Sequence, residues 1–227
     1  MSRVPVYIIC EGDTEKYFVR NVLGPYLGRK GFDVSAPVIG SNGHKGGNVS
    51  FTRAMTDIKG FLRSRPNAVV TTMFDFYGLE KDWPGLKFIP ANIGSSQKAE
   101  MLEKAVLQEV AKSGIDEAQQ RRFIPYFSMY EFEGLLFSDV EALACLVDTD
   151  IKNLQEIADG FDTPEDINNS PNTAPSKRLI ALDSRYDKVD VGVEASRTMG
   201  IDRIREKCPH FNSWLETLEA RALPLRD

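Results

Sequence analysis

Cysteine is scarce in this chain, and long hydrophobic runs are missing. The three cysteines, Cys10, Cys145 and Cys208, lie far apart and form no CxxC pair, so the sequence indicates neither a disulfide framework nor a zinc knuckle. No apolar run approaches the roughly 18–20 residues that a membrane span needs. No signal-peptide pattern precedes the first strand-like segment. We therefore expect a cytoplasmic protein that does not bind a membrane.

Positive charge is not in excess either. The formal net charge is −5 and the pI is about 5.3, whereas proteins that bind nucleic acid usually cluster Lys and Arg against the phosphates. This balance disfavours tight binding of nucleic acid by the chain alone, although a local basic rim is compatible with it. The 227 residues, 42% of them hydrophobic, can bury a full core and suit one domain with an elaborated end.

Short β-rich apolar runs alternate with helical patterns in the first part of the chain. The strand-like runs are 4–9, 34–39, 68–74 and 122–128, and the helical patterns between them are 15–29, 51–63 and 101–112. This alternation predicts an α/β fold with a mostly parallel sheet and helices on both faces. After Asp139 only short helical patterns remain, at 151–158, 176–182, 201–207 and 212–220. We therefore expect an α/β core over 1–139 and a helical C-terminal extension over 140–227 that packs on it.

Acidic residues follow three of the predicted strands. Glu11 follows the first, Asp75 follows 68–74, and Glu131 and Glu133 come just after 122–128. Ligands of open parallel sheets bind beyond the carboxyl ends of the strands, and carboxylates gathered there need a compensating cation such as Mg²⁺. The alternative is that these acids are ordinary turn and helix-cap residues. Glu15 is interpreted as a first-turn helix acid.

Several basic and aromatic residues have a functional and a structural interpretation. Lys177 and Arg178, at the start of a predicted helix, are either phosphate contacts or a solvated basic pair. Lys45, next to His44 in the glycine-rich loop 40–48, either contacts a phosphate or belongs to an ordinary loop, which lacks the GxxxxGK[ST] pattern of a nucleotide-binding P-loop. Cys10, His210 and Trp214 are interpreted as structural residues.

The Glu11-Gly12-Asp13-Thr14-Glu15 turn between a strand and a helix resembles the first motif of Toprim domains. Such domains occur in topoisomerases, primases and overcoming-lysogenization-defect (OLD) family nucleases. Later segments resemble, in combination, the bacterial domain-of-unknown-function 4276 family. These segments are TTMFDFYGL at 71–79, PG at 84–85, EFEGLLF at 131–137, APSKRL at 174–179 and CPHF at 208–211.

The resemblance implies a Toprim-like (Rossmann-like) core with Glu11 as general base or metal ligand and Asp75 as metal ligand. It also implies an ABC/SMC-like ATPase partner in an anti-phage defence system. One position departs from the family pattern: the usual Asp-x-Asp is Asp75-Phe76-Tyr77 here, and a tyrosine with a pKa of about 10 is no magnesium ligand at neutral pH. Glu131 or Glu133, or less favourably Asp82, would supply the missing ligand.

Two functional hypotheses result. The first is a Mg²⁺- or Mn²⁺-dependent nuclease or related phosphoryl-transfer domain that acts on nucleic acid. Its catalytic and metal-binding residues would be Glu11, Asp75, Glu131 and Glu133, and its phosphate contacts would be Lys177, Arg178 and Lys45. The second is a non-catalytic regulatory or toxin-like subunit with a degenerate Toprim site that docks on an ATPase. A homodimer is compatible with the sequence, but no heptad or exposed stripe indicates one.

Overall fold

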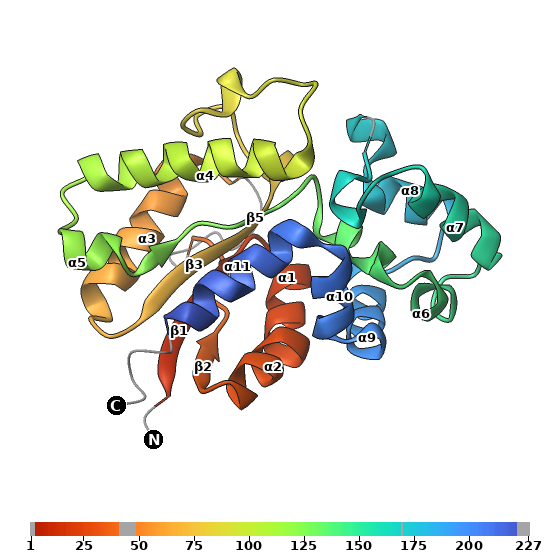
Figure 1. The fold of residues 1–227 in the computed structure, drawn as a ribbon, viewed down its shortest axis with the longest axis horizontal. Helices are drawn as coiled ribbons and strands as arrows, with labels where there is room; N and C mark the ends of the chain where they lie inside the picture. The colour runs from red at the N-terminus through yellow and green to blue at the C-terminus, as the bar shows by residue number, and fades with distance from the viewer. Residues whose placement is uncertain (1–2, 41–48, 169, 222–227) are drawn as a thin grey trace.

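The computed structural model describes residues 3–40, 49–168 and 170–221, which form an α/β fold around a parallel sheet (Figure 1). The strands are β1 (Val4–Cys10), β2 (Phe32–Ser35), β3 (Val69–Asp75), β4 (Phe123–Ile124) and β5 (Phe127–Ser128). Their order is β2-β1-β3-β4, and β5 pairs with β3 beyond β4. Every pair is parallel, so the carboxyl ends of the strands meet at one edge of the sheet.

The two central strands are buried on both faces. Residues Val69–Phe74 of β3 are all buried, and Val6, Ile8, Ile9 and Cys10 of β1 have no exposed surface. Such continuous apolar runs are typical of parallel strands that are covered by helices on both sides. Only Asp75, the last residue of β3, is half-buried, because it reaches the open edge of the sheet.

Helices cover both faces of this sheet (Figure 1). On one face lie α1 (Asp13–Phe18), a π-helical turn (Val19–Leu23), α2 (Gly24–Arg29) and α11 (Pro209–Ala220). On the other face lie α3 (Phe51–Ser64) and α4 (Ser95–Lys112). The short helix α5 (Glu117–Gln120) follows α4. Ile8 packs in one apolar cluster with Phe18 and Phe211. Ile9, which points the other way along β1, packs in a second cluster with Ile58 and Leu102.

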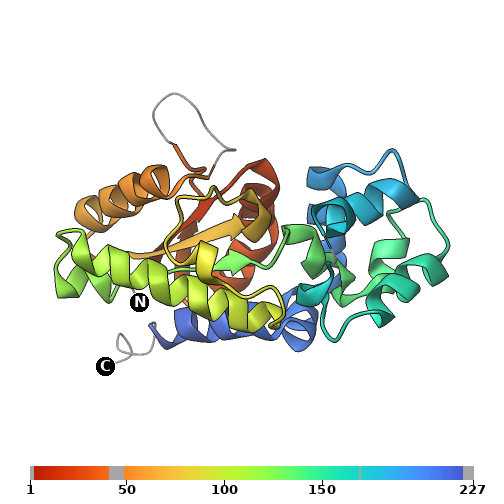
Figure 2. The ribbon, with the colours of Figure 1, turned by 90° about the horizontal axis from the view of Figure 1, so that it is seen from above.

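A group of short helices lies beside the core (Figure 2). It comprises the 3₁₀ segments η4 (Phe132–Ser138), η5 (Pro164–Asp166) and η6 (Pro171–Thr173), and the helices α6 (Val140–Ala144), α7 (Ile151–Asp159), α8 (Pro175–Leu182), α9 (Lys188–Met199) and α10 (Ile201–Lys207). The last helix, α11, returns to the core. There the Trp214 indole N–H donates to Thr71 Oγ1 at 2.9 Å and its ring stacks on Tyr126 at 4.1 Å. The boundary at residue 139 stays a prediction.

The structure corrects the limits of several predicted elements. The strand expected at 34–39 lies at Phe32–Ser35, and Val38 pairs with Cys10 only through an isolated bridge. The run 122–128 is two short strands, because Pro125 between them has no N–H to donate to a neighbouring strand. The sequence did not predict α9. Among the described residues, no helix has the length and apolar character that crossing a membrane requires.

Candidate functional site

Glu11 and Asp75 lie side by side at the carboxyl ends of β1 and β3. The strands are in register, with Cys10 opposite Met73, and the Glu11 N–H donates to the Met73 carbonyl at 3.2 Å. The Asp75 N–H in turn donates to Glu11 Oε2 at 3.1 Å. The Glu11 carboxyl group therefore turns back over the end of β3.

The glutamates of the Glu131-Phe132-Glu133 segment join this pair. The Phe132 N–H donates to Asp75 Oδ1 at 2.8 Å, which holds the segment against the end of β3. Glu131 Oε2 accepts a bond of 2.9 Å from the Ser176 N–H at the start of α8. Glu133 is only 1% exposed, and its Oε1 forms an ion pair of 3.0 Å with Lys188 Nζ at the start of α9. Both glutamates therefore belong to the same site, which the helices after residue 139 complete.

Two members of the site were missed by the sequence interpretation. Glu15 is a first-turn helix acid, as expected, and its Oε2 accepts from the Gly12 N–H at 2.9 Å. It is also 5% exposed, so it is not solvated, and it interacts electrostatically with Glu11, four residues earlier. Lys188 had no signal in the sequence because α9 was not predicted. Its side chain remains 43% exposed and is therefore accessible from solvent. We call Glu11, Glu15, Asp75, Glu131 and Glu133 the acid cluster.

Burial and mutual repulsion raise the pKa of Glu11, Glu15, Asp75 and Glu133. Burial is the largest cause that raises the pKa of Glu11, Asp75 and Glu133, and neighbouring carboxylates raise them further. Burial, with repulsion from Glu11 and Glu133, raises the pKa of Glu15 to about 7. Burial also opposes the charge on Lys188, but Glu133, Glu131 and Asp75 outweigh it and raise the lysine pKa. The Lys188 ammonium group thus stays charged beside these carboxyl groups.

This donor set fits a hard divalent cation in its chemistry. It offers carboxylate oxygens, the ligands that Mg²⁺ and Mn²⁺ prefer, and Glu133 Oε2 is a buried oxygen with no hydrogen-bond partner among the described residues. The present arrangement is not a closed coordination shell: within the described ranges no three Asp, Glu, His or Cys side chains are grouped closely enough to hold one ion. A shared ion would therefore need the carboxyl groups to move closer together than they are here.

Gly78 borders the Glu11 carboxyl group, and Tyr77 directly precedes Gly78. The Tyr77 N–H donates to the Tyr130 carbonyl at 3.0 Å, and burial raises the pKa of the Tyr77 hydroxyl, so this residue stays neutral and supplies no anionic ligand. Gly78 packs directly against Glu11. A Cβ atom at position 78 would lie 2.6 Å from Glu11 Oε1 and closer still to Oε2.

For the other predicted site residues, no contact with the acid cluster is seen among the described residues. Lys177 is exposed on α8. Arg178 donates to the Thr173 carbonyl at 2.8 Å and lies over the Phe161 ring, so its role in phosphate binding stays a prediction, as does that of Lys177. Lys45 and His44 lie outside the described residues. Asp82 accepts from the Phe51 N–H at 3.0 Å and so caps α3.

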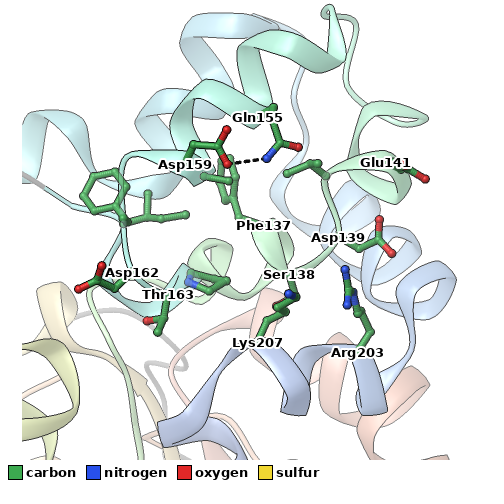
Figure 3. Close-up of a pocket in the computed structure, with 15 residues that line it drawn as sticks. Phe137, Ser138, Asp139, Glu141, Gln155, Asp159, Asp162, Thr163, Arg203 and Lys207 are labelled. Atoms are coloured by element: carbon green, nitrogen blue, oxygen red, sulfur yellow. Dashed lines mark hydrogen bonds between the residues drawn. The ribbon is translucent and has the colours of Figure 1, made fainter.

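A separate hollow of about 530 Å³ lies in the helical region, between η4, α7 and α10 (Figure 3). Asp139, Glu141, Asp159 and Asp162 surround it together with Arg203 and Lys207 (Figure 3). No member of the acid cluster lines it. We therefore place the candidate site at the edge of the sheet, where buried carboxylates have perturbed pKa values, and not in this hollow.

His210, which was interpreted as structural, is buried within the fold. It is 7% exposed, its Nε2 lies 3.2 Å from Glu103 Oε1, and its ring stacks on Tyr126 at 5.0 Å. The backbone N–H of His210 donates to Glu165 Oε2 at 2.9 Å. These contacts link α11 to α4 and η5, which confirms the structural interpretation. Cys10 and Trp214 are buried as expected.

Two solved structures resemble the whole chain. The C-terminal region of the Burkholderia pseudomallei OLD protein has a TM-score of 0.50 at 15% identity, and the match covers 98% of this chain and 100% of that one. The C-terminal region of the Xanthomonas campestris pv. campestris OLD protein has a TM-score of 0.46 at 17% identity, with coverage of 99% and 98%. At 15% identity, the likeness to the Burkholderia pseudomallei region shows the fold alone, and it confirms the expected α/β fold.

The sequence itself also carries a family match. Among curated proteins, none matches the chain significantly. The family described as Domain of unknown function (DUF4276) matches residues 10–219. This range includes the acid cluster, Lys188 and most of α11, and it confirms the resemblance found in the sequence. The chain therefore belongs to the Domain of unknown function (DUF4276) family.

Proposed function

We propose that this chain is a Mg²⁺- or Mn²⁺-dependent phosphodiester hydrolase of the Toprim type that acts on nucleic acid. One observation carries the proposal. The buried Glu133 carboxylate and the half-buried carboxylates of Glu11, Asp75 and Glu131 interact at the carboxyl end of the sheet, where Lys188 pairs with Glu133. A parallel α/β sheet binds its ligands at this edge, and the fold shared with the C-terminal region of an OLD protein is compatible with this function.

Each residue of the acid cluster, and Lys188 beside it, would have a separate role in the reaction. Glu11, Asp75 and one of Glu131 and Glu133 would hold the metal ion, which when bound polarises a phosphoryl oxygen and activates water. Lys188, partly exposed and charged, would release Glu133 to the ion and turn its ammonium group to the phosphate. Glu15, with a pKa of about 7, would hold or release a proton near neutral pH.

The direct test is cleavage of plasmid, linear duplex, single-stranded DNA and structured RNA in Mg²⁺, in Mn²⁺ and in EDTA. We expect metal-dependent cleavage by the wild-type chain and a loss of at least about 100-fold in Glu11→Gln, which keeps the size and the acceptor oxygen of the side chain. Asp82→Asn is the matched control, because Asp82 caps α3 outside the cluster. Calorimetry with Mn²⁺ gives a second readout, in which Glu11→Gln should bind the ion more weakly.

Cleavage that survives unchanged in Glu11→Gln would contradict the proposed site. A second candidate function is a non-catalytic subunit that docks on an ATPase in an anti-phage system. The neutral Tyr77 in place of a second aspartate favours it, and so does the dispersed arrangement of the carboxylates among the described residues. Absence of both cleavage and Mn²⁺ binding in the purified chain, together with cleavage absent after an ATPase partner is added, would favour this second function.

A further inference from the structure

Three aromatic residues lie directly beside the acid cluster. Phe76 and Tyr77 follow Asp75, and Tyr130 precedes Glu131. The Tyr77 N–H donates to the Tyr130 carbonyl at 3.0 Å, so the two segments that carry the acids also hold these rings together. We call Phe76, Tyr77 and Tyr130 the aromatic platform. Each ring thus belongs to a residue one or two positions from an acid of the cluster. A phosphate bound at the acid cluster would therefore have aromatic rings close to it.

The rings of the aromatic platform touch one another. The Tyr77 and Tyr130 ring centroids are 5.3 Å apart, and that of Phe76 lies 6.0 Å from Tyr130 and 6.3 Å from Tyr77. Tyr130 is buried, whereas Phe76 and Tyr77 each keep part of their surface exposed. Tyr130 also has a φ of 62°, a left-handed conformation that is strained for a non-glycine residue. Residues held in this way concentrate at ligand-binding sites.

Lysines accompany the rings. Lys98 Nζ, from α4, donates to the Tyr130 hydroxyl at 3.1 Å and lies 5.5 Å from its ring centre. A second pair lies in η3 (Leu86–Phe88), on the same connection between β3 and α4: Phe88 is 71% exposed, and Lys87 Nζ lies 4.8 Å from its ring centre. Lysine–ring pairs also occur elsewhere, at Lys16–Tyr17 and Lys30–Tyr26, but the Lys98–Tyr130 pair lies next to Glu131 of the acid cluster.

We infer that the partly exposed rings of the aromatic platform, Phe76 and Tyr77, stack unpaired nucleobases together with Phe88, so that the substrate of the acid cluster is single-stranded nucleic acid. This inference rests on the proposed function and names its substrate class. Stacked rings with adjacent lysines bind single strands, because every base offers a face to a ring and every phosphate a charge to an ammonium group. A duplex keeps its bases stacked within the helix, so it has no free base face to offer. Tyr77 thereby gains a role at the position where a second carboxylate was expected.

The test measures binding apart from cleavage, by fluorescence anisotropy of labelled oligonucleotides in EDTA. We expect the wild-type chain to bind single-stranded DNA or RNA more tightly than a duplex of the same sequence. Tyr77→Ala and Phe88→Ala should each weaken binding by about 5- to 100-fold, the range known for one base–ring stack. Tyr77→Phe, which keeps the ring, should bind within about 2-fold of wild type.

Phe61→Ala is the matched control. Phe61 stacks on Tyr7 at 4.9 Å near the end of α3, so its loss removes a ring contact far from the strand ends, and binding should not change. Equal affinity for duplex and single strand, or unchanged binding in Tyr77→Ala and Phe88→Ala, would overturn the inference even if the chain cleaves DNA. Ring-dependent binding of single strands, with neither Mn²⁺ binding nor metal-dependent cleavage even after an ATPase partner is added, would uphold the stacking surface and overturn the proposed function.

Discussion

At the scale of single residues, Gly78 fixes the position of the Glu11 carboxyl group. The glycine has no side chain to fill the space that the carboxyl group occupies, and a Cβ at that place would overlap both of its oxygens. The Glu11 side chain can turn aside at small energetic expense, since its carboxyl end is flexible. A side chain at position 78 should therefore disturb the site and leave the fold intact.

We predict that Gly78→Ala lowers metal-dependent cleavage by about 100-fold, the effect of misplacing a reacting group by roughly 1 Å. The free energy of unfolding should change by less than about 1 kcal/mol. Kinetic assays and urea unfolding measure the two effects. Gly60→Ala is the control: Gly60 lies inside α3 with no atom near its added Cβ, so activity should stay at the wild-type level. A Gly78→Ala enzyme as active as wild type would contradict the position assigned to Glu11.

The sequence predicts site residues that directly follow strands better than site residues that lie on helices. Glu11, Asp75, Glu131 and Glu133 come after apolar runs, and the geometry of parallel sheets brings such positions to one edge. Glu15 has the polar context of an ordinary helix start, and its burial results from the packing of α1 against α9. Lys188 lies more than fifty residues after Glu133, and no local pattern links the two.

At the scale of elements, α9 shows why part of the fold escaped prediction. Val189, Val191 and Val193 alternate with other residues, which is the period of a strand and not of a helix. The Asp187 side chain nevertheless caps the helix by accepting from the Val189 and Asp190 N–H groups. Tertiary packing thus outweighs the local pattern, and it brings Lys188 to Glu133.

We predict that Lys188→Met lowers the free energy of unfolding at neutral pH by about 1–3 kcal/mol, because it leaves the buried Glu133 carboxylate without its partner. In a Glu133→Gln background the same change should have a much smaller effect, with a coupling of at least about 1 kcal/mol. Chemical unfolding of the four proteins measures this cycle.

The control for this cycle is Lys112→Met. Lys112 pairs with Glu109 on the exposed surface of α4, where such pairs contribute about 0–1 kcal/mol. If Lys188→Met and Lys112→Met have equally small effects, the ion pair with Glu133 does not compensate a buried charge.

At the scale of the whole molecule, the helical region after residue 139 completes the site of the sheet. Ser176 and Lys188, both beyond that position, contact Glu131 and Glu133, and Trp214 of α11 contacts Thr71 of β3. The α/β architecture of the first part could be predicted from alternating strand and helix patterns. The way the later helices fold back could not, because the contacts that hold them join residues more than forty positions apart.

The acid cluster also governs how the stability of the whole molecule depends on pH. The pKa of Glu15 is 4.5 in its ordinary environment and about 7 in the fold. Between these values the folded chain binds more protons than the unfolded chain, so the free energy of unfolding falls as the pH rises. The loss from Glu15 alone approaches about 3 kcal/mol at pH 7 and above. His210 acts in the same direction. Burial lowers its pKa, but the Glu103 and Glu165 carboxyl groups outweigh this effect and raise it, so the free energy of unfolding also falls as the pH rises above the ordinary pKa of histidine.

We predict that the melting temperature without divalent ions decreases as the pH rises from about 4.5 to about 7, and that Glu15→Gln flattens this decrease. The difference between wild type and Glu15→Gln isolates the contribution of Glu15, because both proteins share His210 and the other carboxyl groups of the acid cluster. Mn²⁺ should raise the wild-type melting temperature most at the high end of this range, where the carboxylates are ionised and a cation offsets their repulsion. Thermal unfolding at a series of pH values, with Mn²⁺ and with EDTA, measures both effects. A wild-type profile that runs parallel to that of Glu15→Gln, with no added stabilisation by Mn²⁺, would show that the buried carboxylates neither carry the repulsion nor bind the ion.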